Sequence, residues 1–431
     1  MSHSHNPGTY LGQALAGTRQ ACKRCLYTSD HPLGLVLDDE GICSGCRIHE
    51  EKDRLDWAER WSRLQRLVAP YRSKSGQAYD CIVPVTGAND SYWIVHLVKE
   101  RLGLNPLLVT YNKYYNTALG IRNLANLRIR FDCDILVQNV NPQSVKAITR
   151  TTLRELGSVY WHCLAGQSVF PVQTAVRYQV PLIIWGAHQG LEQVGMFSHE
   201  HEVEMTRRYR KDHDLMGHEA DDLLGAFDTL REEHIWQYRY PDDQQLQAVG
   251  VRGIYLGNYV RWDPKAQHEQ MIAAKAYGTA AFERTFDTYD HVDCWTYMDL
   301  HDTLKLAKAG YGKVTDHACR EIRHGRLTRE QGLALVRRHE QQPARHRQLF
   351  CDWLGLDGSG LDFLIDRARN PRHWQLQAPG RYAFTGPSSD EAATPTGWTD
   401  GDLGPGARFI ANDRLDHEGR GGYITVGKGH P

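Results

Sequence analysis

The chain has 431 residues, 24% of them charged, and a formal net charge of −1 at pH 7, so we expect two or three domains and no global basic field for a phosphate backbone. No apolar run approaches the length of a membrane span, and the N-terminal stretch MSHSHNPGTYLGQALAG lacks the apolar core of a secretory signal. We therefore expect a cytoplasmic protein with no membrane insertion, no nucleic-acid partner and reduced cysteines.

Four cysteines follow an N-terminus (residues 1–20) that is expected to be flexible. They form the pattern Cys22-x-x-Cys25 and Cys43-x-x-Cys46, and two such knuckles can place four thiolates around Zn²⁺. Four sulfurs leave no open coordination position, so we favour a structural metal over a redox or disulfide role. Residues 21–47 are predicted to be a zinc ribbon.

The next segment, residues 48–77, is predicted to be a linker helix. Over residues 48–73 its apolar side chains recur at helical spacing with charged residues between them. These side chains are Leu55, Trp57, Trp61, Leu64 and Leu67.

Residues 78–260 alternate strand, loop and helix. The predicted strands are CIVPV (81–85), PLLVTY (106–111), CDILVQNV (133–140) and VPLIIWGA (180–187). Short, nearly all-apolar strands between helices indicate an α/β domain with a parallel sheet covered on both faces. Ligands bind such sheets at the carboxyl ends of the strands, where residues 86–91 fall.

Two segments follow this domain. Residues 261–374 are predicted to be a helical, substrate-side region. Residues 375–431 form a Gly/Pro-rich tail whose composition predicts loop or disorder, although ARFIA and GYITVG can form a small hairpin.

The stretch VPVTGANDSYW joins the first predicted strand to a helix. A Gly-containing turn before a helix exposes backbone N–H groups and suits phosphate, while the Lys-containing Walker pattern is absent. Thr86 and Ser91 can donate hydroxyls, and Asp90 can help to hold Mg²⁺. The alternative is that Asn89, Asp90 and Ser91 are only good helix-capping residues.

VPVTGANDS resembles the PP-loop of ATP pyrophosphatases, whose usual form is Ser-Gly-Gly-x-Asp-Ser. From about residue 20 to about residue 345 the chain is similar to the N-acetyl sugar amidotransferases of bacterial surface-polysaccharide and flagellin-glycan biosynthesis. The similar stretches include CKRCLYTSDHP, GLNPLLVTYN, YWHCLAGQSVFPVQTAVRYQVPLIIWG and LHDTLKLAKAGYGKVTDHACREIRHGRLTREQG.

Two positions depart from the PP-loop pattern in a way that matters. Ala88 replaces the second Gly and adds a Cβ where the backbone should approach phosphate closely. Asn89 stands where Lys is frequent, so another residue must neutralise the phosphates, and Lys113 and Lys313 are candidates. Thr86 replaces Ser and keeps the hydroxyl.

The resemblance implies an adenine nucleotide alpha hydrolase-like PP-loop domain that uses ATP and Mg²⁺ to convert a sugar N-acetyl group to an acetamidino group. The substrate would be a nucleotide sugar or an acidic sugar. Ammonia would come from a separate glutaminase, through an ammonia-channel subunit, with free ammonia as the alternative source. The implied nucleotide-binding residues are Thr86, Gly87, Ala88, Asn89, Asp90, Ser91, Tyr111, Gly186 and Glu192.

The resemblance also implies residues on the sugar side. Those for substrate binding are Arg122, Asn123, Trp161, His162, Arg320, Arg323 and His324. Those for catalysis are Asp90, Ser91, Lys313, Asp316 and His317. A solvated, salt-bridged helix is the alternative for residues 313–326, and core packing is favoured over covalent catalysis for Cys163 beside His162. His199 and His201 are expected at the surface.

Two other functions fit parts of the sequence. A PP-loop thiolation enzyme acting on tRNA can also carry a zinc ribbon, but it should show a basic surface and further catalytic cysteines. A non-catalytic zinc and nucleotide scaffold is expected if Ala88 prevents ATP binding.

Overall fold

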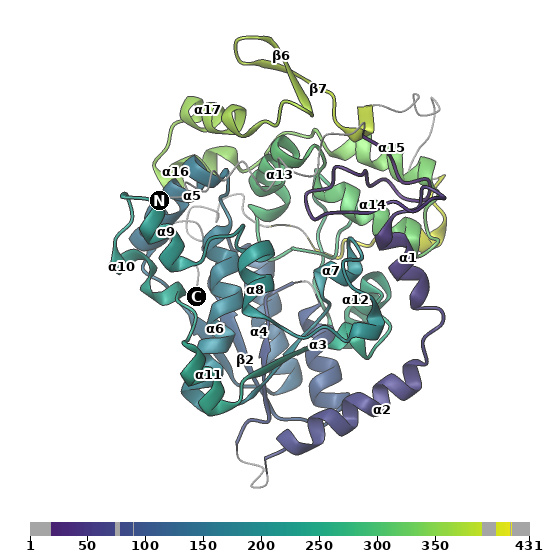
Figure 1. Ribbon diagram of the computed structural model, residues 1–431, viewed down its shortest axis with the longest axis vertical. Coiled ribbons are helices and arrows are strands. Elements are labelled where there is room, and N and C mark those ends of the chain that lie inside the picture. Colours follow the sequence, from purple (N-terminus) through teal and green to yellow (C-terminus); the bar gives the residue numbers. More distant parts are fainter. Residues whose placement is uncertain (1–18, 74–77, 89, 390–401, 414, 416–431) are drawn as a thin grey trace.

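A parallel sheet forms the centre of the molecule (Figure 1); the computed structural model describes residues 19–73, 78–88, 90–389, 402–413 and 415. Its five strands are β1 (Cys81–Pro84), β2 (Pro106–Tyr111), β3 (Ile135–Gln138), β4 (Leu182–Trp185) and β5 (Arg252–Tyr255). All neighbouring pairs are parallel, in the order β3-β2-β1-β4-β5. The predicted α/β class is confirmed, and the strand order reverses between β1 and β4.

Both faces of the sheet are apolar and covered. Val83 of β1 and Leu108 of β2 belong to one core cluster. Their neighbours on the same strands, Ile82 and Val109, belong to another. Alternate residues of a strand point to opposite faces, so this division explains why the strands read as nearly continuous apolar runs.

The helices that follow β1, β2 and β3 have clear sequence signals at their ends. They are α3 (Ser91–Val95), which continues as the π-helical η2 (His96–Arg101), α4 (Ala118–Phe131), α5 (Pro142–Leu156) and α6 (Trp161–Tyr178). Thr117 caps α4 by accepting a hydrogen bond from the Gly120 N–H at 2.9 Å, and Gly157 ends α5 in the left-handed conformation.

The predicted linker helix is two helices. They are α1 (Ser44–Glu51), which begins inside the cysteine segment, and α2 (Trp57–Val68), followed by the turn η1 (Ala69–Tyr71). Asp56 starts α2 by accepting hydrogen bonds from the N–H groups of Ala58 and Glu59, at 3.0 and 2.9 Å. The apolar spacing predicted the helical face but not this cap.

Short elements connect β4 to β5. They are α7 (Gln189–Glu192), η3 (His199–His201), α8 (Arg207–Tyr209), η4 (Arg210–Asp214), α9 (Ala220–Ala226), α10 (Glu232–Ile235), η5 (Trp236–Tyr238) and α11 (Asp243–Val249). The prediction that His199 lies at the surface is wrong, because this residue is fully buried. Its backbone N–H and its ring Nδ1 lie 2.9 and 3.2 Å from Glu51 Oε2, which satisfies them inside the protein.

The C-terminal region is helical up to a hairpin. Its elements are η6 (Leu256–Asn258), α12 (Pro264–Lys275), η7 (Tyr297–His301), α13 (Asp302–Ala309), α14 (Lys313–Arg323), α15 (Arg329–His339), α16 (Arg347–Leu354), α17 (Gly358–Ala368), β6 (Trp374–Ala378), β7 (Arg381–Phe384), η8 (Pro387–Ser389) and η10 (Pro405–Ala407). The antiparallel β6–β7 hairpin projects from the top of Figure 1.

The hairpin lies earlier in the chain than the sequence predicted. The ARFIA stretch contains no strand, and GYITVG lies outside the described residues. Among the helices that the structure describes, none combines the length and the apolar composition needed to cross a bilayer.

Candidate active site

A cavity of about 360 Å³ opens at the carboxyl ends of β1, β2, β4 and β5. It lies where the strand order reverses, which is the usual position of a ligand site in an open parallel sheet. Side chains of α3, α6 and η4 complete its walls. The cavity therefore occupies the place that the sequence indicated for the turn after the first strand.

The turn after β1 is held by its own hydroxyl groups. Ser91 Oγ accepts a hydrogen bond from the Thr86 N–H at 2.9 Å, and Thr86 Oγ1 accepts one from the Ala88 N–H at 3.2 Å. A Cβ on Gly87 would lie 2.0 Å from the Gly120 carbonyl oxygen, so only Gly allows the turn to approach α4. Asn89 lies outside the described residues.

Ala88 fits the turn without strain. It is fully buried in the core cluster beneath the turn and is absent from the described residues with left-handed backbone. The methyl group therefore packs into the core, and a positive φ is not required of it.

Asp90 presents an unsatisfied carboxylate to the cavity. It precedes α3, yet its side chain accepts no capping hydrogen bond, and within the described chain its buried Oδ1 has no partner. Burial raises its pKa to about 6, and the charges that act on it include those of His268, Asp290 and Glu192. Helix capping does not account for this residue.

Further buried polar atoms line the same cavity without partners in the described part of the chain. They are Trp185 Nε1, His188 Nε2, Tyr209 OH and Arg210 Nε. Buried polar groups are normally hydrogen-bonded, so a concentration of unpaired ones in a cavity indicates a polar ligand. The donors suit a nucleotide, and the Asp90 carboxylate suits its Mg²⁺.

Two of the three remaining nucleotide-side predictions line the cavity. Tyr111 does so while its hydroxyl contacts His162 Nδ1 at 3.0 Å, and Gly186 follows β4. Glu192 does not line it; its Oε2 pairs with the ammonium of Lys52 at 2.6 Å.

Lys52 was not predicted. Its side chain is 1% exposed and also donates to the Trp262 carbonyl at 3.2 Å. No sequence signal distinguished it from neighbouring charged residues, because its partner Glu192 lies 140 positions further along the chain.

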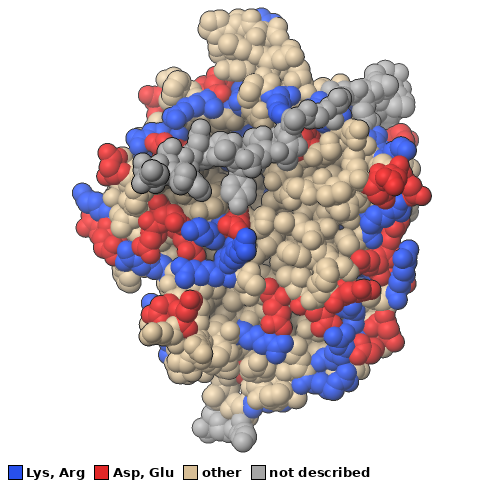
Figure 2. Space-filling model, viewed as in Figure 1, with Lys and Arg blue, Asp and Glu red and all other residues tan. Residues whose placement is uncertain are grey.

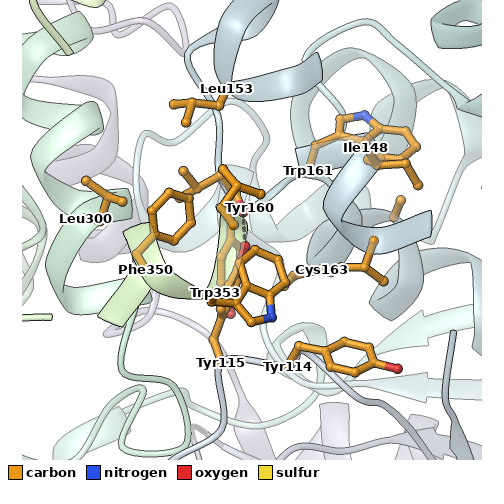
Figure 3. Close-up of a cluster of buried hydrophobic side chains, with 14 of the residues drawn as sticks. Tyr114, Tyr115, Ile148, Leu153, Tyr160, Trp161, Cys163, Leu300, Phe350 and Trp353 are labelled. Carbon is orange, nitrogen blue, oxygen red and sulfur yellow. Dashed lines mark hydrogen bonds between the residues drawn. The ribbon is translucent and has the colours of Figure 1, made fainter. Parts of the chain in front are cut away.

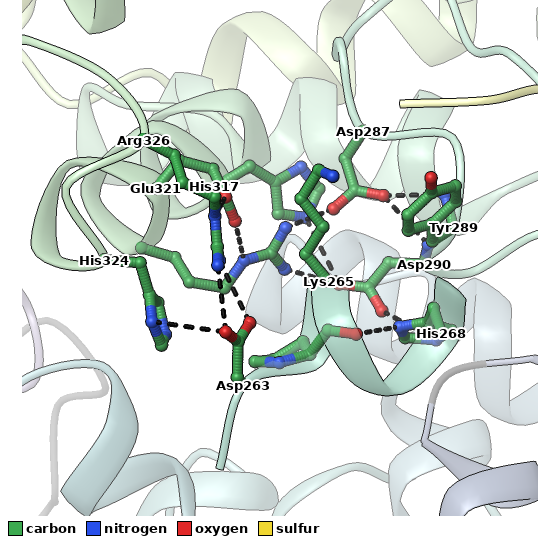
Figure 4. A network of polar contacts seen from close by, with 12 residues as sticks. Asp263, Lys265, His268, Asp287, Tyr289, Asp290, His317, Glu321, His324 and Arg326 are labelled. Carbon is green, nitrogen blue, oxygen red and sulfur yellow. Dashed lines mark hydrogen bonds and ion pairs between the residues drawn. The ribbon is translucent and has the colours of Figure 1, made fainter. Parts of the chain in front are cut away.

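Four predicted residues of α14 lie in two polar clusters. In the first, drawn in Figure 4, Arg320 reaches Asp290 Oδ2 at 3.0 Å and also contacts Asp287. His317 Nε2 lies 3.7 Å from Asp290 Oδ2, and its Nδ1 contacts the Thr285 hydroxyl at 2.7 Å.

The aspartates and His317 of this cluster are close enough to hold a metal ion. The Arg320 guanidinium already bonds to both carboxylates, however. Burial alone would raise the pKa of Asp287, but Arg320 holds it well below its usual range. We therefore describe the group as an ion-pair network.

The second cluster surrounds Asp316. Its Oδ2 lies 2.5 Å from Lys305 Nζ and 3.3 Å from Lys313 Nζ. Its Oδ1 accepts hydrogen bonds from the Tyr27 hydroxyl and the Gln193 amide, both at 2.7 Å. The predicted pair Lys313 and Asp316 is thus brought together, beside the cysteine segment.

Arg323 and His324 do not line the cavity. Arg323 donates to the carbonyls of Glu192 and Gln193, at 3.0 and 2.8 Å, and its NH2 lies 3.7 Å from Cys43 Sγ. His324 Nδ1 lies 3.6 Å from an Asp263 carboxylate oxygen.

Arg122 and Asn123 are also engaged elsewhere. Arg122 pairs with Asp413 at 2.5 Å on the surface. Asn123 exchanges hydrogen bonds with the backbone of Gly278, at 2.9 and 3.0 Å. Lys113, a candidate for phosphate neutralisation, is buried against Asp293 at 2.6 Å.

The start of α6 is part of a large aromatic core, shown in Figure 3 with Trp161 and Cys163 among its side chains. Trp161 is fully buried and donates its indole N–H to the His218 carbonyl at 2.9 Å. Burial raises the pKa of the Cys163 thiol well above its usual value and lowers that of His162 to about 3. A neutral thiol beside a neutral imidazole favours core packing over nucleophilic catalysis.

The four cysteines predicted as metal ligands converge. Cys22, Cys25, Cys43 and Cys46 are fully buried, and their Sγ atoms all lie within 4.8 Å of one another. A tetrahedral Zn²⁺ with Zn–S bonds of about 2.3 Å needs sulfurs roughly 3.8 Å apart, so the group fits such an ion. It is a possible Cys₄ zinc site that closes around the metal.

Comparison with known proteins bears on the C-terminal region. Residues 283–385 match the family model of the C-terminal domain of WbpG-like lipopolysaccharide biosynthesis proteins. This stretch runs from before η7 to the end of the β6–β7 hairpin, so it includes α14 and the Asp316 cluster. The match supports a place in lipopolysaccharide or related sugar biosynthesis and suggests an enzyme.

The chain is also similar to the uncharacterized protein MJ1599 of Methanocaldococcus jannaschii. The two are 26% identical over 121 residues, which is 27% of this chain and 42% of that relative. The chain thus spans less than half of the relative that it matches.

Proposed function

We propose that this protein is an ATP-dependent amidotransferase that converts the N-acetyl group of an anionic sugar to an acetamidino group. The observation that carries the proposal is the switch-point cavity, where a PP-loop-like turn ends β1 and buried polar atoms lack partners. The match to a lipopolysaccharide biosynthesis domain supports a sugar substrate.

The chemistry explains the need for ATP. An amide carbon is a weak electrophile and its oxygen a poor leaving group. Attack of the amide oxygen on the α-phosphorus of ATP releases pyrophosphate and gives an O-adenylyl imidate. Ammonia then adds to the imidate carbon and AMP departs with the oxygen, so catalysis depends on positioning and charge stabilisation.

We assign roles by position. The hydroxyl groups of Thr86 and Ser91, both of which line the cavity, are assigned to the phosphates, and Asp90 is the group suited to Mg²⁺. Trp185, Arg210 and Tyr111 also line the cavity. Ammonia would come from a separate glutaminase, through a channel-forming partner.

The test is release of pyrophosphate and AMP from ATP, with Mg²⁺ and ammonium, across nucleotide-linked and acidic N-acetyl sugars. We expect stimulation by one sugar and a product that has an NH group in place of the amide oxygen by mass spectrometry. No stimulation by any sugar would count against the proposal.

The tRNA thiolation enzyme is the closest rival. On the face in Figure 2, Lys and Arg lie among Asp and Glu without forming a broad basic patch. Titration of tRNA at several salt concentrations separates the two functions, since a thiolation enzyme should bind tightly with a steep salt dependence. The scaffold alternative would instead bind no ATP at millimolar concentrations.

A further inference from the structure

The segment after β4 holds a histidine whose protonation is set by its own backbone contact. His188 caps α7, and its Nδ1 accepts a hydrogen bond from the Gly190 N–H at 3.0 Å. A ring nitrogen that accepts a hydrogen bond carries no proton, so the proton of the neutral imidazole is on Nε2. The Nε2–H group of His188 is therefore a hydrogen-bond donor.

This donor has no partner among the described residues. His188 is 2% exposed and lines the cavity, and its Nε2 is one of the buried atoms without a hydrogen bond there. A buried donor without an acceptor is costly. The cap uses only Nδ1, and Asn or Ser would supply it without this cost. Helix capping therefore does not account for a histidine at this position.

Other donors gather around His188. Its ring lies 4.4 Å from the Tyr209 ring and 4.7 Å from the Tyr255 ring. Arg210 NH2 donates to the Tyr255 hydroxyl at 3.3 Å, and the guanidinium lies 4.1 Å from the centre of the Trp185 ring. All five residues line the cavity. Four of them have a buried polar atom without a partner in the described chain, and we call these the donor group: His188, Tyr209, Arg210 and Trp185.

The donor group carries no excess charge. Asp214 balances the charge of Arg210, because its Oδ2 lies 2.9 Å from Arg210 NH1. Burial and the charges of Arg210 and His213 lower the pKa of His188 to about 4, so the ring is neutral at pH 7. Burial also raises the pKa of the Tyr209 hydroxyl, which keeps its proton. Neutral donors beside a closed ion pair suit an uncharged acceptor oxygen better than a free anion.

The donor group lies beside the turn after β1. The strands that lead to the turn and to His188, β1 and β4, are neighbours in the sheet, and neighbouring strands are about 4.8 Å apart. The segment after β4 also packs on α3, since a Cβ on Gly186 would lie 2.9 Å from Ile94 Cδ1. A group bound by these donors is therefore close to the turn, to which the proposed function assigns the phosphates of ATP.

We propose that the donor group binds the acetamido carbonyl oxygen of the sugar substrate, with His188 Nε2–H as the donor that selects it. The inference rests on the proposed function, because it places the reacting group of that substrate beside the turn. An amide oxygen has two lone pairs, so it can accept from His188 and still present the other pair to the α-phosphorus.

His188 has a binding and orienting role in this proposal. It does not take the proton of the attacking ammonia, because Nε2 already carries a proton and Nδ1 is engaged by the Gly190 N–H.

Nitrogen NMR of histidine-labelled full-length protein tests the tautomer without a ligand. We expect His188 to have a protonated Nε2 and an unprotonated Nδ1 between about pH 5.5 and about pH 8.5. His234 is the matched control, because its Nδ1 also accepts a backbone N–H, that of Arg231 at 3.1 Å, and it does not line the cavity.

Two uncharged sugars then test the acceptor. N-acetylglucosamine carries an acetamido group, and glucose has a hydroxyl in its place. We expect N-acetylglucosamine to shift the Nε2–H resonance of His188 but not that of His234, and glucose to shift neither. Sugar hydroxyls are the other source of an acceptor oxygen, and equal shifts with the two sugars would identify them and overturn the proposal.

Variants separate the donor from the cap. His188→Asn keeps an N-cap acceptor and removes the Nε2 donor, so it should bind N-acetylglucosamine about tenfold more weakly, by saturation-transfer NMR of the sugar methyl group. His188→Gln carries an amide nitrogen at about the reach of Nε2 and should retain more of the affinity. His234→Asn should change nothing. The resonance shifts of the native protein decide the question if His188→Asn fails to fold.

Three further results would overturn the proposal. They are a His188 ring protonated on Nδ1, a His188 resonance that N-acetylglucosamine leaves unchanged, and native affinity in His188→Asn. Pyrophosphate release, measured on the same samples, tests the proposed function separately. A selective shift by N-acetylglucosamine without pyrophosphate release with any sugar would retain the subsite and reject the amidotransferase. Pyrophosphate release without the shift would do the reverse.

Discussion

Asp90 is the residue at which folding and the proposed chemistry conflict most clearly. A buried carboxylate oxygen without a hydrogen-bond donor is costly. Asp90 Oδ1 has no such donor among the described residues, and the side chain has no capping role there to compensate. Its pKa is raised to about 6 from 3.8, so the folded state disfavours its charged form. Such a group is retained where a bound cation needs it.

Asp90→Asn should therefore abolish pyrophosphate release while stabilising the ligand-free protein. Above pH 6 the wild type bears the cost of a buried charge that the amide lacks, on the order of 2–3 kcal/mol. The difference should shrink as the pH falls from 6 towards 3.8 and vanish below about pH 3, where the carboxyl is protonated in both folded and unfolded chains.

Urea unfolding of both proteins at pH 8 and pH 3 measures this difference. Asp352→Asn, at an exposed position on α16, is the control and should alter neither stability nor activity. Equal stabilities of wild type and Asp90→Asn at pH 8 would show that the carboxylate is solvated after all.

Ala88 marks the departure from the PP-loop pattern, and the structure predicts that restoring Gly does not help. The methyl group is fully buried in a core cluster and the backbone is unstrained. Ala88→Gly should lower the unfolding free energy by about 1 kcal/mol, from a small cavity and added backbone freedom. Pyrophosphate release should not rise, and a tenfold rise would mean that the Cβ obstructs the phosphates.

At the scale of elements, the cysteine segment is joined to the candidate active site. Lys52 follows α1 directly and pairs with Glu192, while Arg323 of α14 bridges the backbone of residues 192–193 and the sulfur of Cys43. The segment after β4 is therefore held from both sides by contacts that depend on the cysteine cluster.

Loss of the metal should therefore affect activity as well as stability. We expect about one equivalent of zinc per chain in the wild type and in Cys133→Ser, and almost none in Cys43→Ser. Cys43→Ser should unfold at least about 5 °C lower and lose pyrophosphate release. Metal analysis and thermal unfolding test this, and a zinc-free variant with full activity would contradict the coupling.

The sequence predicted elements better than it predicted contacts. The strand over residues 106–111 was placed exactly, because its apolar run is bounded by Pro and polar residues. β5 was missed, since a four-residue strand that begins with Arg252 and Gly253 has little apolar signal. The pairing of Lys52 with Glu192 had no sequence signal, because it depends on tertiary structure alone.

At the scale of the whole molecule, the cavity lies at the point between β1 and β4 where the strand order reverses. A ligand bound there contacts strands on both sides of this point. Residues of β1 and β2 on one side of the reversal, of β4 and β5 on the other, and of α6 line the cavity. A ligand that bridges these parts binds the folded state only. Its affinity therefore adds directly to global stability.

ATP with Mg²⁺ should thus raise the unfolding temperature by several degrees, since a ligand at a hundred times its Kd stabilises by about 2.7 kcal/mol. Gln167→Trp should remove this effect while leaving the ligand-free unfolding temperature nearly unchanged, because Gln167 is a half-buried residue that lines the cavity. Gln65→Trp, on the exposed face of α2, should retain the full response. A response that persists in Gln167→Trp would place the nucleotide elsewhere, and no response in the wild type at millimolar ATP would favour the scaffold over the enzyme.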